Sequence, residues 1–114
     1  MLKAIMRVLL TALVVISANT TAAAKPDDSA ALEGVTTGKV VFDINMADAK
    51  KMTLYLSVIA ETVDDLERQG VTPDVILAFR GLSVKLVSTD RENAELTDYE
   101  HLDRIAEQLA ALQA

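Results

Sequence analysis

Four residues at the ends of two apolar runs could form a ligand site, in which Arg80 could hold a small anion. Asp43 and Asn45 close the run 39–45, and Arg80 and Gly81 directly follow a second run. Because ligands of open parallel sheets bind beyond the carboxyl ends of the strands, these four residues form the candidate ligand-binding site. An arginine fork binds anions, and a glycine allows close backbone approach. The alternative is structural: Gly81 serves a tight turn, and Arg80 is solvated.

Other catalytic and metal-binding signatures fail at particular residues. The stretch 43–54 begins like a calcium loop, but its sixth position is Asp48 instead of glycine and its twelfth is Leu54 instead of glutamate. His101 is the only histidine, and we interpret it as a surface residue. The sequence has no cysteine, so it offers no thiolate nucleophile, persulfide carrier or Cys-based metal site. We expect no catalytic residues, no metal and no cofactor.

The elements that must position the candidate site are a strand, a long helix and a second strand. The runs 39–45 and 73–79 are apolar, as is typical of strands buried in a parallel sheet. Between them, helical spacing predicts a helix over 47–69, with Asp48 at its start and Gly70 at its end. Its apolar stripe consists of Met52, Tyr55, Leu56, Ile59, Val63 and Leu66. This order predicts a βαβ unit.

The remaining segment is less regular. Residues 82–87 fit either a strand or a short helix, and periodicity does not decide between them. Thr97 and Glu100 form a capping-box sequence, which predicts the start of a final amphipathic helix. The predicted fold class is α/β, with a parallel sheet, a βαβ unit and a C-terminal helix. Because this core is small, either the chain assembles with copies of itself or with a partner, or it is a truncated piece of a longer domain.

The N-terminal segment 1–24 has the pattern of a secretory signal peptide. Lys3 and Arg7 supply a positive region, an apolar stretch follows, and small residues precede a cleavage point after Ala24. The apolar stretch is shorter than the roughly 20 residues of a transmembrane helix. We therefore expect cleavage, a periplasmic location and no stable membrane anchor; an uncleaved anchor is the alternative.

Charge and composition define the mature chain. The formal net charge is −6, and removal of 1–24, which holds two basic residues and no acidic ones, makes it −8. An acidic surface repels phosphates, so we expect no nucleic acid partner. Residues 25–38 contain Pro26, Asp27, Asp28, Ser29, Gly34 and Gly38 and are expected to form a flexible mature N-terminus, which leaves 39–114 as the domain.

The pattern resembles the DsrE/DsrF-like family of sulfur-relay and related proteins. The resemblance rests on 39–45, the long helix after it, and 75–86, where a strand ends in a glycine turn before a short apolar stretch. It covers roughly 39–112, and exported family members fit best. The resemblance implies a three-layer α/β fold with a parallel sheet, commonly in homo-oligomers such as trimers or hexamers. It also favours a helix for 82–87.

Three functional hypotheses follow. The favoured one is an exported, DsrE-like, non-catalytic binding or assembly module that forms a homo-oligomer or binds a protein partner. The second is a fragment of a sulfur-relay protein whose cysteine lies beyond this chain, because the resemblance places the sulfur-carrying cysteine in the later part of the domain. The third is a small-anion binding domain that uses Arg80 and the strand ends.

Overall fold

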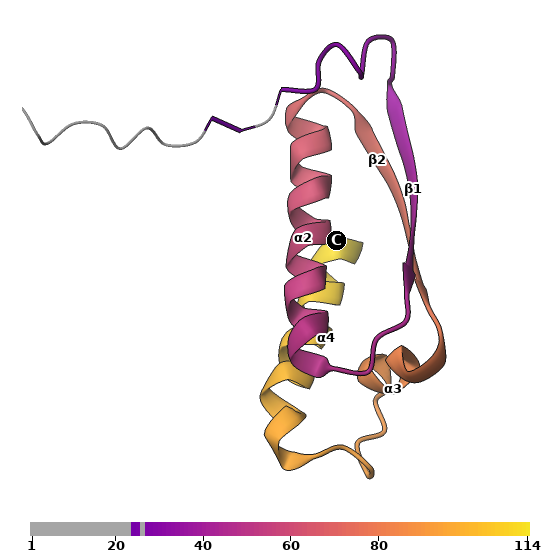
Figure 1. The fold of residues 1–114 in the computed structure, drawn as a ribbon, viewed down its shortest axis with the longest axis vertical. Helices are drawn as coiled ribbons and strands as arrows, with labels where there is room; N and C mark the ends of the chain where they lie inside the picture. Colours follow the sequence, from indigo (N-terminus) through magenta and orange to yellow (C-terminus); the bar gives the residue numbers. More distant parts are fainter. Residues whose placement is uncertain (1–23, 26) are drawn as a thin grey trace, which may run out of the picture.

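The computed structural model describes residues 24, 25 and 27–114, so the predicted signal peptide lies outside the described residues except for its last position. Two strands and two long helices account for most of the described chain (Figure 1). In chain order the elements are β1 (Thr37–Ile44), α2 (Ala49–Arg68), β2 (Thr72–Phe79), the 3₁₀ turn η1 (Gly81–Ser83), α3 (Val84–Val87), the 3₁₀ turn η2 (Leu96–Asp98) and α4 (Tyr99–Gln113).

The sheet is parallel and has two strands, β1 and β2. Its register runs without a break from Thr37 opposite Thr72 to Ile44 opposite Phe79. Side chains alternate between the two faces, and along β1 every second residue turns inward toward the helices. The predicted βαβ unit and α/β class are confirmed. The first strand begins at Thr37, slightly before the predicted run.

Helix α2 begins two residues after the predicted start at 47 and ends one residue before the predicted end at 69, and Asp48 and Gly70 flank it as predicted. The Asp48 side chain accepts a hydrogen bond from the Lys51 backbone N–H at 2.8 Å, which satisfies one of the free amides of the first turn. Gly70 adopts a positive φ of 79° directly after the helix, a conformation that favours glycine. Of the predicted apolar stripe, Met52, Leu56 and Ile59 lie in the buried core cluster and Tyr55 packs against it. The cluster consists of Ile44, Ala49, Met52, Leu56, Ile59, Leu86, Leu102 and Ile105.

The segment after β2 forms short helical turns, so 82–87 is helical and not a strand. The capping box predicted at Thr97 is wrong, because residues 96–98 form a 3₁₀ turn that continues into α4. Thr97 therefore lies inside a helical turn, and Asp98 takes the cap position without a side-chain hydrogen bond. Helix α4 packs on α2, where Gln108 Nε2 donates to the Thr53 carbonyl oxygen at 3.0 Å.

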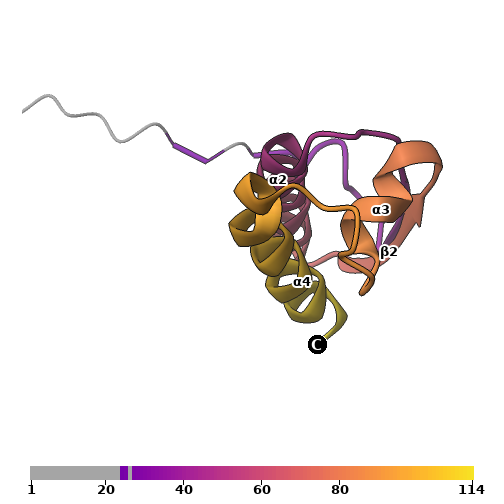
Figure 2. The same cartoon turned by 90° about the horizontal axis from the view of Figure 1, so that it is seen from below.

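The two long helices lie on one face of the sheet, and the described residues place no helix on the other (Figure 2). On that outer face Val41 is 65% exposed and Ile76 is 58% exposed, and the two lie opposite each other in the register. The described chain therefore has two layers, a sheet and a helical layer. The second helical layer of a three-layer fold is not present within residues 27–114.

Residues ahead of β1 turn back over the end of α2. The backbone N–H of Asp28 donates to Gln69 Oε1 at 2.9 Å, and Lys25 Nζ lies 3.4 Å from Asp65 Oδ1. Gly34 takes a positive φ of 76° within this turn. These contacts fix where the chain enters β1.

Candidate functional site

The structure brings the four predicted site residues together at the carboxyl ends of β1 and β2. Asp43 is the penultimate residue of β1, and Arg80 directly follows β2. Arg80 Nε donates to Asp43 Oδ1 at 2.6 Å, and Arg80 Nη2 donates to Asp43 Oδ2 at 3.0 Å. This bidentate pair is the strongest arrangement that an arginine and a carboxylate form. The two strand ends are therefore joined by side chains as well as by the sheet.

Asn45 and Gly81 complete this cluster. Oriented to satisfy both partners, the Asn45 amide oxygen accepts from Arg80 Nη1 at 3.2 Å and its nitrogen donates to the Arg80 carbonyl oxygen at 3.3 Å. Gly81 has a positive φ of 60°, and a Cβ at this position would lie 2.5 Å from the Asn45 amide. Gly81 thus serves both a tight turn and a close contact, as the structural interpretation of this residue predicts.

Ser83 is a cluster member that sequence reasoning did not assign. Its side chain is fully buried, and its hydroxyl oxygen lies 2.8 Å from the Ile44 carbonyl oxygen and 2.7 Å from the Arg80 carbonyl oxygen. The hydroxyl therefore joins the end of β1 to the turn after β2. The only signal in the sequence was a small polar residue two positions after the glycine turn.

The electrostatics of the cluster favour the ionised pair. The hydrogen bonds from Arg80 lower the pKa of the Asp43 carboxyl below its ordinary value, and the same hydrogen bonds raise the pKa of Arg80. Both side chains are more than half exposed, so water screens the pair. Because Asp43 already occupies the arginine fork, an external anion at Arg80 would have to displace a carboxylate. The contacts among Asp43, Arg80 and Asn45, here called the clasp, join the ends of the two strands. They hold the Asp43 carboxylate in its ionised form.

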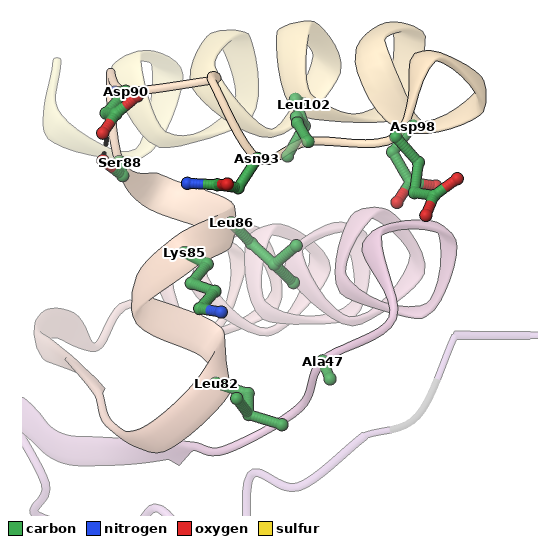
Figure 3. A pocket seen from close by; sticks show the side chains of 11 residues that line it. Ala47, Leu82, Lys85, Leu86, Ser88, Asp90, Asn93, Asp98 and Leu102 are labelled. Atoms are coloured by element: carbon green, nitrogen blue, oxygen red, sulfur yellow. Dashed lines mark hydrogen bonds between the residues drawn. The ribbon is translucent and has the colours of Figure 1, made fainter.

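A separate cavity of about 420 Å³ lies beside the cluster, between α3 and α4 (Figure 3). Leu82, Leu86 and Leu102 supply apolar walls, and Lys85 contributes the cationic group among acidic loop residues. A cavity of this size suits a small ligand. None of the four predicted site residues lines it. The full lining is Ala47, Leu82, Lys85, Leu86, Ser88, Asp90, Asn93, Ala94, Glu95, Asp98 and Leu102.

His101 is half-buried in a more open groove between the start of α2 and α4. Lys50, Lys51 and Arg104 also line this groove, which makes it locally positive on an acidic protein. Among the described residues, no group of three or more His, Cys, Asp or Glu side chains is arranged to hold a metal ion. Within the same part of the chain, no helix has the length and apolar character needed to cross a membrane.

No protein-family model matches this chain, and neither a curated protein nor a solved structure matches it.

Proposed function

We propose that this chain is an exported, non-catalytic binding or assembly module that joins its open sheet to a protein partner. The observation that carries the proposal is the two-stranded parallel sheet, in which each strand has one unpaired edge. Parallel sheets occur almost only with more strands and with both faces covered, and an unpaired strand edge is a ready site for another strand. In the described chain, the open strand edges and the uncovered outer face of the sheet are therefore the surfaces that a protein partner would bind.

Apolar side chains on both faces of the sheet support this proposal. Val41 and Ile76 form an exposed apolar pair on the outer face. On the inner face Val75, Leu77 and Phe79 stay half-buried, because a groove of about 370 Å³ separates β2 from the end of α4. Contiguous apolar surface of this kind marks interaction sites in soluble proteins.

The competing functions fit this chain less well. A sulfur carrier needs a thiolate, and this sequence has no cysteine, so that function requires residues beyond the given sequence. A small-anion site at Arg80 competes with the Asp43 carboxylate already bound to the fork. Membership of the DsrE/DsrF-like family is part of the proposal, and it rests on the apolar patterns of 39–45, the long helix and 75–86.

Photo-crosslinking of the full chain in living cells tests this proposed function. A photoreactive benzoylphenylalanine is placed at Val41 or at Ile76, and a matched variant carries it at Glu92, an exposed residue of the loop before α4. We expect a discrete adduct from the two sheet positions and none from Glu92. The absence of adducts from both sheet positions, in protein shown to be folded, would refute the binding role.

Export is tested separately by the mass of the protein recovered from the periplasm. We expect a chain that begins at Lys25, since cleavage is predicted after Ala24. A full-length chain that stays with the membrane fraction would instead support the uncleaved anchor.

A further inference from the structure

We propose that the partner at the β1 edge is a second copy of this chain. The β1 strands of the two copies pair antiparallel about a two-fold axis at Val41, which gives the strand order β2–β1–β1–β2. This inference rests on the proposed function, because it names the partner of the open sheet. Three features of the described residues carry it: the backbone groups of the edge, the charges along it, and an exposed apolar flank of α2.

The β1 edge has the free backbone groups that strand pairing needs. The Thr36 and Ile44 carbonyl oxygens accept from the N–H groups of Thr72 and Arg80 at 2.9 and 3.0 Å, so the even-numbered residues of β1 face β2. Because backbone groups alternate along a strand, Lys39, Val41 and Asp43 direct their N–H and C=O groups to the free edge.

The free edge of β2 is less suited to such pairing. By the same alternation it presents the odd-numbered residues of β2, among them Pro73, which has no N–H to donate. No proline interrupts β1. The β1 edge is therefore the better site for a second strand.

Charge along the β1 edge selects one antiparallel register. Centring the two-fold axis on Lys39 or on Asp43 places two like charges directly opposite each other, which is destabilising. Centring it on Val40 or Phe42 places Val41 opposite a charged residue of the second copy. Only the register centred on Val41 places valine opposite valine and each Lys39 opposite Asp43 of the second copy. The edge is self-complementary in that register alone among these five.

Helix α2 carries two exposed apolar side chains, and one of them, Leu54, also lines the groove that α2 shares with α4. Leu54 is 68% exposed and Val58 is 51% exposed, one turn apart on the same side of the helix. Tyr55 packs edge-on against Phe42 of β1, with ring centroids 6.3 Å apart. The side of α2 that faces α4 includes Ser57, whose hydroxyl oxygen accepts from Gln108 Nε2. At 3.6 residues per turn, Val58 lies about 60° from Tyr55 and about 100° from Ser57, so Val58 marks the flank of α2 beside β1.

The proposed pairing brings this flank against the same flank of the second copy. Helix α2 contacts both strands, since Tyr55 packs on Phe42 of β1 and Ile59 lines a groove with Leu77 of β2. With strands about 4.8 Å apart, the two α2 helices then lie about 10 Å apart, close to the usual distance for packed helices. Tyr55 packs beside Phe42, which is one strand residue, or about 3.3 Å, from Val41. That distance equals about two residues along α2, so the part of α2 level with the axis at Val41 lies near Val58. Each Val58 then meets its equivalent.

Disulfide formation between introduced cysteines tests this register, because the native chain has no cysteine to interfere. In the full-length Val41→Cys variant, opposite Cα atoms of a hydrogen-bonded antiparallel pair lie about 5.5 Å apart, within disulfide range. In Ile76→Cys, an equally exposed control, three strand spacings separate the two cysteines by about 14 Å. We expect a disulfide-linked dimer from Val41→Cys under mild oxidation and none from Ile76→Cys. Light scattering of the unmodified chain should give twice the monomer mass.

Two outcomes would overturn this inference. One is a chain that stays monomeric and forms no disulfide at Val41→Cys. The other is a dimer that links through Ile76→Cys and not through Val41→Cys, which would mean face-to-face packing of the sheets. If photo-crosslinking at Val41 then captures a different protein, the proposed binding function stands and only the identity of the partner is wrong. If it captures nothing at either sheet position, both fail.

Discussion

Replacing Gly81 with alanine tests whether the turn after β2 is built around Asn45. Gly81 is one of three glycines with positive φ, and a Cβ there would lie 2.5 Å from the Asn45 amide. Gly70 is the matched control, because its φ is 79° but a Cβ would find no atom within 4 Å. Gly70→Ala therefore measures the cost of the left-handed backbone alone, and Gly81→Ala measures that cost plus the displacement of Asn45.

The expected magnitudes follow from these two geometries. A non-glycine residue in the left-handed conformation costs about 1–2 kcal/mol, which is the expected loss for Gly70→Ala. At Gly81 the added methyl also pushes the Asn45 amide away from Arg80, and each hydrogen bond lost costs about 0.5–1.5 kcal/mol. We expect Gly81→Ala to lower the free energy of unfolding by about 2–4 kcal/mol.

Urea unfolding followed by circular dichroism supplies the assay, with an Asn45→Ala background to separate the two contributions. In that background the clash is gone, so the cost of Gly81→Ala should fall to about that of Gly70→Ala, or about 1–2 kcal/mol. Equal costs for Gly81→Ala with and without Asn45 would show that the close contact has no energetic weight and would refute the reasoning.

Three further predictions concern stability and pH. Ser83→Ala should lower the free energy of unfolding by about 1–3 kcal/mol, measured by urea titration, because it removes a buried hydroxyl that joins two strand ends. The pKa of Asp43 is lowered by Arg80, so the stability difference between the native chain and Asp43→Asn should be constant above the ordinary pKa of 3.8. That difference should decline as the pH falls from 3.8 through the lower, folded pKa, and a difference that stays unchanged as the pH falls below 3.8 until Asp43 is protonated would contradict this. Ile59→Ala should cost about 2–5 kcal/mol in thermal or urea unfolding, and Ile76→Ala on the exposed face about 0.5 kcal/mol or less.

The strands and the long helix were predictable because the burial of each element produces a local pattern of apolar residues in the sequence. The runs 39–45 and 73–79 are apolar because both strands contribute to the core, and the stripe of α2 has helical spacing because one side of that helix is buried. Convergence of the four site residues was predictable for the same reason, since parallel strands end at one edge of the sheet.

The internal pairing of the site was not predictable from the sequence. Whether Arg80 faces solvent or Asp43 depends on the strand register and on the φ of Gly81, which are both set by tertiary packing. The capping box at Thr97 failed because η2 extends the helical path backward by one turn, and only the route of the preceding loop decides that. Ser83 was missed because burial of a lone serine leaves no periodic signal.

The clasp at the strand ends bears on where this chain can act. The Arg80 guanidinium donates three of its five N–H groups to Asp43 and Asn45, and these bonds join the ends of the two strands. By fixing Asp43 on the outer face in its ionised form, the clasp also presents a carboxylate beside the free β1 edge, two residues from Val41 and four from Lys39. The Asp43 carboxylate that binds Arg80 within one copy is thus also the charge that selects the pairing register with the second copy. In such an arrangement, folding of the strand ends and recognition of a second copy depend on the same side chain.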